Sequence, residues 1–386
     1  MTKEIFLFAG EKSGDLLGSF LYQALQDQLP NYHFTGVAGP EMRAAGMEGL
    51  LRTEEFELMG FSDILSSLPK LWKQFHVVRD YILKNRPEAV VLIDYPGFNL
   101  KMASSLRKHG YQGKVVQYIS PTVWAWGKKR AEKMAQTLDL LLTIYPFEQQ
   151  CFTNTRLNVK YVGNPLKEIV QKHRYIHDWA SLFGIADTRN LIAIFPGSRR
   201  GEIQLNLPYQ LKVAEMLKKK DPSVTFAISC AHEKILPAIH QMLQPNSLKL
   251  NRDIFLLPKA YCYELMKDCR TALAKSGTVT LELAIHKRPT VVMYKLSLLN
   301  RIIAQYLLRL NLPHYCIVNI LANKRVYPEL IEKGLSPSKI LTELQKINVD
   351  GQARLTCIDE CGYVSSLFQG IDASEQAARA IKGQLC

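Results

Sequence analysis

The most informative stretch of this chain is AVVLIDYP at residues 89–96. Its first five residues are apolar without interruption, which indicates a β-strand buried on both faces, and the turn after them ends that strand. Comparable runs occupy residues 5–9, 115–119 and 140–144. Helical stretches such as 15–28 separate the runs, so the sequence predicts a parallel sheet covered by helices on both faces.

The same alternation restarts in the second half of the chain. An apolar run at residues 191–195 precedes a helical stretch at 210–219, and further runs lie at 225–229 and 290–294. We therefore expect an α/β protein with two Rossmann-like domains. The expected division is an N-terminal domain at residues 1–170, a C-terminal domain at 171–362 and a helical tail at 363–386. Because ligands of such sheets bind beyond the carboxyl ends of the strands, the residues that follow each strand are the candidate site residues.

Charge is the unusual feature of the composition. The 386 residues include 49 Lys and Arg against 35 Asp and Glu, which leaves a net charge of +14. The hydrophobic share of 47% is that of an ordinary globular protein, so disorder, collagen-like repeats and coiled coil are excluded as main descriptions. The positive excess indicates an anionic partner, which is a nucleic acid, an anionic membrane or a phosphorylated substrate.

Cysteine spacing and the lengths of apolar runs bear on metal content and compartment. The eight cysteines form no CxxC pair, and Cys357 and Cys361 have no partners at zinc spacing. An Asp-x-Asp motif for a metal-bridged diphosphate is also missing. We therefore expect buried thiols in a reducing cytosol, no metal and no cofactor. The apolar run at residues 5–8 is too short for a signal peptide, and no run of about 20 residues predicts a spanning helix.

Two motifs in the second domain suit a nucleoside diphosphate. FPGSRRGEI at residues 195–203 brings a Gly-Ser turn and two arginines to a helix N-terminus, where N–H and guanidinium groups favour phosphate. KSGTVTLE at 275–282 opens another helix, with Glu282 placed to accept from ribose hydroxyls. Each motif alone is compatible with a plain turn, but together they predict a donor site. Its expected residues are Gly197, Ser198, Arg199, Ser276, Gly277, Thr278 and Glu282.

Polar residues after two strands of the first domain are candidates for the acceptor side. GEKSGD at residues 10–15 is neither a Walker A nor a GxGxxG motif. It is either a structural turn in which Asp15 caps a helix, or a polar rim that touches an acceptor hydroxyl. Asp94 is either a general base that faces the cleft between the domains, or a turn-forming residue.

Two stretches combine helical apolar spacing with basic residues, at 59–83 and 296–310. Each is compatible with a helix that faces the core, and we expect the first to break at Pro69. Their shared aromatic and basic character favours helices that lie on an anionic membrane surface. The residues expected to face the membrane are Phe61, Ile64, Leu68, Leu71, Trp72 and Phe75.

The motifs together resemble bacterial lipid-A-disaccharide synthase over almost the whole chain. Besides the motifs above, GVAGP at 36–40, VWAW at 123–126, PFE at 146–148 and VNILA at 318–322 carry the resemblance. It implies a GT-B fold, in which two Rossmann-like domains face a central cleft. It also implies inverting transfer of 2,3-diacylglucosamine from UDP-2,3-diacylglucosamine to 2,3-diacylglucosamine 1-phosphate, with a β-1,6 link and UDP as the leaving group.

The resemblance also implies roles for individual residues. Asp94 matches the family's general base, and Arg199 and Glu282 match its diphosphate arginine and its ribose acid. Asn319 falls in a motif on the nucleotide side. The residues implied on the acceptor side of the cleft are Gly10, Glu11, Ser13, Asp15, Ser120 and Trp124. The resemblance further implies a homodimer with exchanged C-terminal segments, peripheral on the cytoplasmic face of the bacterial inner membrane.

The chain departs from the family pattern at two places that bear on chemistry. Gly97 stands where the family usually has an aspartate, so a second carboxylate beside Asp94 is missing. A phosphate-contacting loop has lost its usual arginine, although Lys324 or Arg325 can take its place. Two other functions remain open. One is an epimerase or undecaprenyl-linked transferase of the same fold, and the other is a basic nucleic-acid-binding or scaffold protein, for which interleaved basic and aromatic residues are missing.

Overall fold

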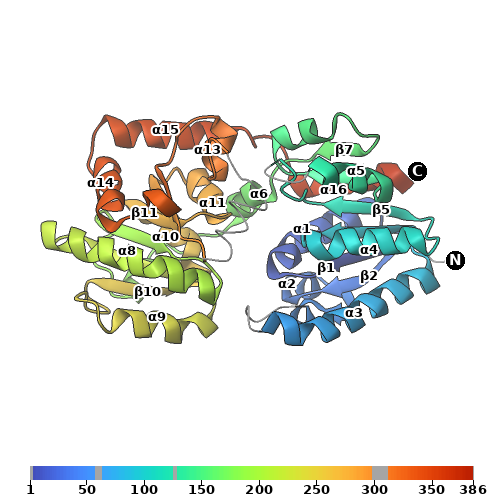
Figure 1. Cartoon of the computed structure of the whole chain (residues 1–386), viewed down its shortest axis with the longest axis horizontal. Coiled ribbons are helices and arrows are strands. Elements are labelled where there is room, and N and C mark those ends of the chain that lie inside the picture. The colour runs from blue at the N-terminus through green and yellow to red at the C-terminus, as the bar shows by residue number, and fades with distance from the viewer. Residues whose placement is uncertain (1–2, 57–62, 125–127, 298–311, 386) are drawn as a thin grey trace. The chain divides into compact units, whose positions relative to one another are not determined.

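The computed structural model describes residues 3–56, 63–124, 128–297 and 312–385, which form two compact units. Unit 1 comprises Met1–Glu168 and Gly370–Cys386, and unit 2 comprises Ile169–Gln369. Each unit is built on a parallel sheet with helices interleaved along the chain (Figure 1). This arrangement confirms the predicted α/β class with two parallel-sheet halves.

The sheet of unit 1 contains, among the described residues, seven parallel strands in the order β3-β2-β1-β4-β5-β6-β7. These strands are β1 Lys3–Ala9, β2 Tyr32–Ala38, β3 Glu48–Arg52, β4 Ala89–Ile93, β5 Lys114–Tyr118, β6 Leu140–Thr143 and β7 Asn158–Tyr161. Every residue of β4 is buried, as its apolar sequence predicts. β2 passes so close to β1 that a Cβ at Gly36 would lie 1.8 Å from the carbonyl oxygen of Leu7, and only glycine fits there.

Helices cover both faces of this sheet. They are α1 Lys12–Gln28, α2 Pro40–Ala44, α3 Asp63–Asn85, α4 Pro96–Lys108, α5 Lys128–Thr137 and α16 Ala373–Leu385, with 3₁₀ turns at Thr53–Glu55 and Pro146–Phe152. A further helix, α6 Pro165–Lys172, begins in unit 1 and ends in unit 2. On one face Phe6 and Phe8 of β1 pack with Val78 of α3 and Met102 of α4. On the other face α1 contacts α16, which also lies against β5 and β6.

The described part of unit 2 has a six-stranded parallel sheet in the order β10-β9-β8-β11-β12-β13. Its strands are β8 Leu191–Phe195, β9 Thr225–Cys230, β10 Ile254–Pro258, β11 Thr271–Lys275, β12 Thr290–Tyr294 and β13 Glu329–Ile331. Its helices are α7 Trp179–Leu182, α8 Arg200–Lys220, α9 Leu236–Leu243, α10 Cys262–Asp268, α11 Val279–Ile285, α13 Ile317–Ala322, α14 Pro337–Asn348 and α15 Gln352–Ser366, with 3₁₀ turns at Glu233–Ile235, Lys259–Tyr261 and Glu332–Gly334. Two apolar clusters fill the two sides of the sheet, one with α8, α9 and α14 and one with α7, α10 and α11.

The C-terminal segment differs from the separate tail expected at residues 363–386. Helix α15 continues through residue 363 to Ser366 within unit 2. Helix α16 then returns to unit 1, where it lies among the earliest elements of the chain (Figure 1). The physical reason is its apolar stripe, because Ala377, Ala378 and Ile381 are buried there.

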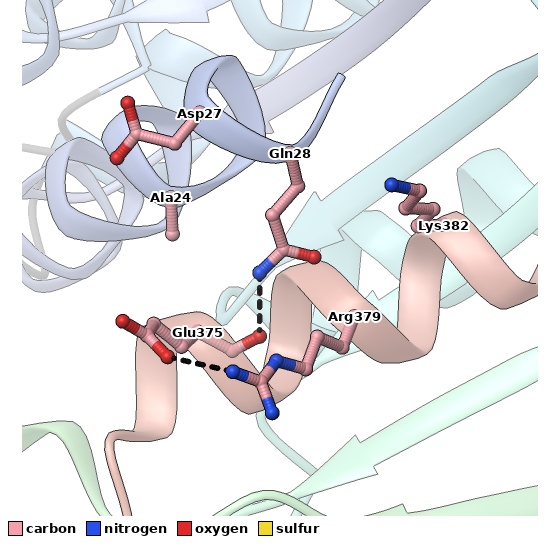
Figure 2. Close-up of a pocket in the computed structure, with 6 residues that line it drawn as sticks. All are labelled: Ala24, Asp27, Gln28, Glu375, Arg379 and Lys382. Atoms are coloured by element: carbon pink, nitrogen blue, oxygen red, sulfur yellow. Dashed lines mark hydrogen bonds and ion pairs between the residues drawn. The ribbon is translucent and has the colours of Figure 1, made fainter.

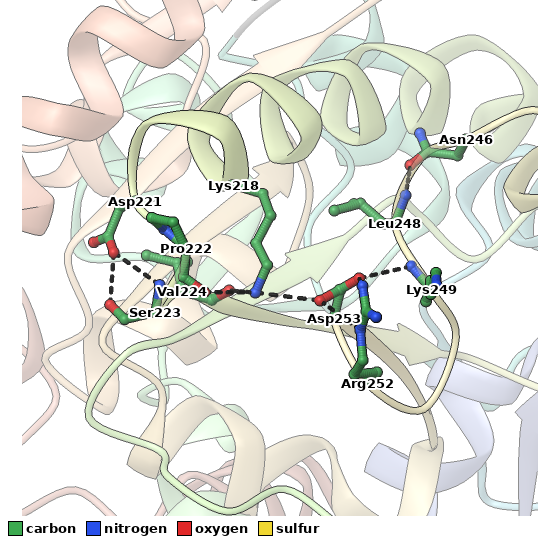
Figure 3. A network of polar contacts seen from close by, with 10 residues as sticks. All are labelled: Lys218, Asp221, Pro222, Ser223, Val224, Asn246, Leu248, Lys249, Arg252 and Asp253. Atoms are coloured by element: carbon green, nitrogen blue, oxygen red, sulfur yellow. Dashed lines mark hydrogen bonds and ion pairs between the residues drawn. The ribbon is translucent and has the colours of Figure 1, made fainter.

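A polar network ties together the loops at the amino-terminal ends of β9 and β10 (Figure 3). The ammonium of Lys218, near the end of α8, donates to the carbonyl oxygens of Pro222 at 2.8 Å and Val224 at 2.9 Å. The same Nζ lies 3.3 Å from Oδ1 of the buried Asp253. Oδ2 of Asp253 accepts from Arg252 at 2.8 Å and from the Lys249 N–H at 2.9 Å.

Removal of the central carboxylate of this network is expected to destabilise the protein. The hydrogen bond from Arg252 holds the pKa of Asp253 well below its usual range. This stabilisation is therefore fully present above the unfolded-state pKa of about 3.9 and is lost as the pH falls through the lowered pKa of the folded state. In urea denaturation at neutral pH, Asp253→Ala should lower the free energy of unfolding by about 1–3 kcal/mol.

An exposed ion pair supplies the matched control for this prediction. Arg189 lies 3.0 Å from Asp187, with side chains that are 87% and 40% exposed. Asp187→Ala should therefore change the free energy of unfolding by at most about 0.5 kcal/mol. Equal losses for the two variants would show that burial of Asp253 adds nothing.

Candidate functional site

The two motifs predicted to bind a nucleoside diphosphate meet at one edge of the unit 2 sheet. Residues 196–199 follow β8 and lead into α8, and residues 276–278 follow β11 and lead into α11. β8 and β11 are paired neighbours, so the two loops leave the carboxyl edge of the sheet side by side. This is the position at which sheets of this type bind their ligands.

The first loop makes a tight turn at Gly197. Gly197 has a φ of +116°, and a Cβ there would lie 2.7 Å from Oε2 of Glu202, so the turn requires glycine. Ser198 donates its N–H to the same oxygen at 3.4 Å, and its carbonyl oxygen lies 3.0 Å from Nε2 of His232. Arg199 occupies the N-cap position of α8 and is exposed to solvent.

The second loop places Glu282 one turn into α11. The Tyr263 hydroxyl donates to Oε1 of Glu282 at 2.8 Å, and burial raises the pKa of this carboxyl. Thr280 closes the loop by donating its hydroxyl to the Gly277 carbonyl oxygen at 2.7 Å. Sequence reasoning did not identify Tyr263, because it comes from α10 and no motif contains it.

Both polar atoms of the Asn319 side-chain amide form hydrogen bonds to other residues of the protein. Its Oδ1 accepts from the N–H groups of Val326 at 2.9 Å and Tyr327 at 2.8 Å, and its Nδ2 donates to the Tyr327 carbonyl oxygen and to Glu329. These bonds hold α13 against the residues that lead into β13 and against its first residue, Glu329. Lys324 and Arg325 in the same region form ion pairs with glutamates of α15 and α14, at 2.7 Å and 3.0 Å.

In unit 1, Asp94 and residues 10–15, which form the short turn after β1 and the start of α1, also meet at a sheet edge. β1 and β4 are paired neighbours, and both segments follow the ends of these strands. The Ser13 hydroxyl donates to Oδ2 of Asp94 at 2.9 Å. Gly10 allows this approach, because a Cβ there would lie 2.5 Å from the Tyr95 ring.

The backbone that carries Asp94 is held in an uncommon conformation. Asp94 has a φ of +51° and Ile119, at the end of the next strand, has a φ of +73°, although neither is glycine. The buried amide of Gln117 donates to the carbonyl oxygens of Asp94 at 3.0 Å and Ile119 at 3.1 Å. Asn99 also donates to the Asp94 carbonyl oxygen. Gln117 therefore orients both strand ends and Asn99 the end at Asp94. Gln117 lies in none of the sequence motifs.

The side chain of Asp15 is buried against a neighbouring turn. Its buried carboxylate accepts from the N–H groups of Gly39 at 2.8 Å, Glu41 at 2.9 Å and Met42 at 3.1 Å. It therefore caps α2, a helix other than its own, and both carboxylate oxygens are used there. Gly39 is required because a Cβ would lie 2.3 Å from the Asp15 carboxylate.

The remaining acceptor-side candidates lie near the strand ends of unit 1. Glu11 is the N-cap residue of α1, and the buried Ser120 donates its hydroxyl to the Pro121 carbonyl oxygen at 3.0 Å. The Trp124 ring packs edge-on against Phe147, with centroids 5.6 Å apart. Next to Phe147, the carboxylate of Glu148 is buried and accepts from the N–H groups of Ile144 at 3.1 Å and Tyr145 at 3.0 Å.

Glu148 is expected to make the stability of the protein depend on pH between about 4 and 7. Burial raises the pKa of Glu148 to about 7. The folded state then holds this proton more tightly than the unfolded chain, whose glutamate pKa is about 4.3, so the stability falls as the pH rises from about 4 to 7. Glu148→Gln should flatten this decline, measured as the change in urea midpoint between about pH 5 and pH 8. An unchanged slope would contradict the assignment.

Helix α3 carries most of the residues expected to face a membrane. Phe61 lies outside the described residues, as does the 298–311 part of the second stretch, and no side-chain placement is described for Ile64 or Leu68. The helix continues through Pro69 without the expected break. Leu71 and Phe75 pack against the core instead of facing outward, because they share a helical face with the buried Val78. Trp72 faces solvent and is 68% exposed.

Metal ligands and membrane-spanning helices were the other features considered in the sequence. No group of three or more His, Cys, Asp and Glu side chains in this part of the chain is placed to hold a metal ion. Cys357 and Cys361 are buried thiols on α15. Among the described helices, none combines the length and the apolar content that a membrane crossing requires.

The class of protein follows from the two parallel sheets and the loops at their carboxyl edges. They define a GT-B fold, which solved sugar-nucleotide glycosyltransferases and epimerases share. A putative UDP-N-acetylglucosamine 2-epimerase from Listeria monocytogenes superimposes with a TM-score of 0.68 at 12% identity, covering 99% of this chain and 96% of the epimerase. Residues 5–381 match the family model described as lipid-A-disaccharide synthetase. The chain belongs to this family.

Curated relatives carry the same family name. The lipid-A-disaccharide synthase of Chlamydia pneumoniae is 38% identical over 378 residues, which are 97% of this chain and 62% of that protein. That of Geobacter sulfurreducens is 34% identical over 343 residues, covering 89% of this chain and 87% of the relative. The chain thus spans less than two thirds of the chlamydial relative and most of the Geobacter one.

Proposed function

We propose that the protein is an inverting hexosyltransferase that joins two acylated glucosamine units of lipid A. The donor is UDP-2,3-diacylglucosamine and the acceptor is 2,3-diacylglucosamine 1-phosphate. The observation that supports this most is the meeting of the Arg199 turn and the Glu282 helix at one sheet edge, which suits a nucleoside diphosphate. Family membership supports the acyl-sugar substrates, and the solved epimerase named for a UDP-sugar supports the nucleotide.

The proposed reaction is one direct displacement. Asp94 takes the proton of the acceptor hydroxyl while that oxygen attacks the anomeric carbon, and UDP leaves with the bonding electron pair. A single displacement inverts the anomeric centre and forms the β-1,6 link. It needs one base, so the missing carboxylate at Gly97 removes no required group.

Other residues supply binding on the two sides of this reaction. Arg199 and the N–H groups at the start of α8 balance the charge that grows on the departing diphosphate. Ser13 orients Asp94 through the 2.9 Å hydrogen bond, and Glu282 accepts from the ribose. The further donor-side residues are Gly197, Ser198, Ser276, Gly277 and Thr278, and the further acceptor-side residues are Gly10, Glu11, Ser120 and Trp124.

One assay tests this function directly. The protein is incubated with synthetic diacyl donor and diacyl acceptor, and UDP release and disaccharide are measured with and without chelator. We expect both products only when both acylated substrates are present, with no effect of the chelator. Turnover of UDP-N-acetylglucosamine alone would favour an epimerase, and salt-dependent nucleic-acid binding without turnover would favour a basic binding protein.

We also propose that the protein is peripheral on the cytoplasmic face of the inner membrane, with α3 on the lipid surface. Trp72 of α3 is exposed, and so are Lys70 and Lys73 near it in the sequence and Val77 five residues further on. Aromatic residues favour the lipid–water interface, and each basic residue near an anionic bilayer adds about 1 kcal/mol.

Liposome flotation tests this surface. Binding to anionic vesicles should fall severalfold for Trp72→Ser and further for Trp72→Ser combined with Lys73→Ser, because an apolar anchor and a charge are lost. Leu182→Ser in unit 2 is the matched control, since Leu182 is also an exposed apolar residue, at 65%. Equal vesicle binding by all variants, or binding that does not depend on anionic lipid, would contradict the proposal that α3 lies on the membrane surface.

We propose, finally, a homodimer in which C-terminal segments are exchanged. Figure 2 shows the contact that an exchanged segment would reproduce: Gln28 of α1 donates to the Glu375 carbonyl oxygen of α16 at 3.2 Å, beside Arg379 and Lys382. Light scattering of the full chain tests the dimer. Oxidation of a Gln28→Cys, Glu375→Cys variant tests exchange, because exchanged segments give a covalent dimer and unexchanged ones a cross-linked monomer.

A further inference from the structure

An ion pair without a role in the proposed chemistry joins the two loops of the donor side. Lys275 is the last residue of β11, and Glu202 lies in the first turn of α8. Their Nζ and Oε1 atoms are 3.0 Å apart, and the side chains are 14% and 19% exposed. The pair is thus largely withdrawn from solvent at the edge where the two loops meet.

The carboxylate of Glu202 lies against the backbone of the turn at residues 197–198. Its Oε2 accepts from the Ser198 N–H at 3.4 Å and lies so close to Gly197 that a Cβ there would be 2.7 Å away. One oxygen therefore faces a backbone N–H of the turn, and the other faces an ammonium. These are the two kinds of donor that a phosphate group binds at such a turn.

The ammonium of Lys275 reaches toward both loops. A Cβ at Gly277 would lie 3.8 Å from its Nζ, and the same atom stands 4.6 Å from the centroid of the Tyr294 ring. Lys275 therefore lies close to Glu202, to the Gly277 turn and to the Tyr294 ring.

We propose that Lys275 is a further diphosphate-binding residue, and that Glu202 is its counter-ion until a nucleoside diphosphate binds and takes its place. The ammonium of Lys275 is then paired both with and without bound nucleotide. This avoids the cost of an isolated, poorly solvated charge. The exchange also makes diphosphate compete with an internal carboxylate. This inference rests on the proposed function, because it takes the donor to be a nucleoside diphosphate.

Calorimetric titration of the full chain with UDP and with uridine tests this pairing. Lys275→Met should weaken UDP binding roughly tenfold or more and leave uridine binding unchanged, since only the phosphate contact is lost. Lys275→Arg should restore most of the UDP affinity, and Glu202→Gln should strengthen UDP binding severalfold. Lys267→Met is the matched control, because Lys267 stands at the same 4.6 Å from the Tyr175 ring in unit 2.

The outcomes separate this inference from the proposed function. Wild-type protein that binds no UDP would overturn both. Wild-type protein that binds UDP, with Lys275→Met unchanged or weakened equally for uridine, would overturn the inference alone, and so would weaker UDP binding by Glu202→Gln. Lys275→Met leaves Glu202 without its partner, so the double variant Lys275→Met, Glu202→Gln is titrated as well. It should retain the loss of UDP affinity and keep the melting temperature of Glu202→Gln.

Discussion

Replacement of Asp94 by Ala is expected to lower the turnover number by a factor of about 10² to 10⁴. The physical reason is the loss of the base that accepts the proton of the attacking hydroxyl. The affinity for UDP should not change, because Asp94 belongs to unit 1 and the predicted nucleotide loops belong to unit 2. Single-turnover rates with diacyl donor and acceptor, together with UDP titration, measure both quantities.

Asp94→Asn sharpens this prediction. The amide oxygen of the variant can still accept from Ser13, as the carboxylate does at 2.9 Å, so the orientation is kept and only the basicity is lost. It should be nearly as inactive as Asp94→Ala. Asp27→Asn on the exposed side of α1 is the control and should retain full activity. Substantial turnover by Asp94→Asn would contradict the assignment of the base.

Replacement of Arg199 by Ala is expected to weaken donor binding by about ten- to a hundredfold. Arg199 is the N-cap residue of α8, next to the turn made by Gly197. From there its guanidinium group can donate two hydrogen bonds to one phosphate. Its loss also removes the positive charge that would balance the departing diphosphate, so the turnover number should fall as well. The UDP dissociation constant measures the first effect, and kcat at saturating donor measures the second.

Arg199→Lys distinguishes a fork-shaped contact from a point charge. Lysine keeps the charge but loses the paired geometry, so it should recover only part of the donor affinity. Arg189→Ala is the control, because Arg189 is also a solvent-exposed arginine of unit 2 and pairs only with Asp187 among the contacts described for it. Full activity of Arg199→Ala would remove Arg199 from the donor side.

The strands and the loops after them could be predicted because both follow from local pattern. The uninterrupted apolar runs at 89–93 and 191–195 are buried strands in the structure, and the polar loops after them lie at sheet edges. The C-terminal helix was also expected, but not its position. Its apolar stripe indicates that it is covered, without indicating that α1 covers it.

Roles that depend on distant partners were not predictable from pattern. The sequence predicts that Asp15 is either a helix cap or a contact of the acceptor. In the structure it caps α2, because the fold places the Gly39 turn against it. The sequence predicts that Leu71 and Phe75 face a membrane. In the structure they pack against the core, because α3 lies against the sheet. A helical period states which residues share a face but not what that face contacts.

The amino-acid order by itself determined two parallel sheets, the loops at their edges and the residue types available there. Strand burial and turn chemistry are local properties, so neighbouring residues are enough to specify them. Only the tertiary structure decided which groups meet: the side chains of Ser13 and Asp94, the Gln117 amide and the Asp94 carbonyl oxygen, and the side chains of Lys275 and Glu202. These pairs span tens of residues along the chain, and strand order in the sheet, which no local pattern encodes, brings them together.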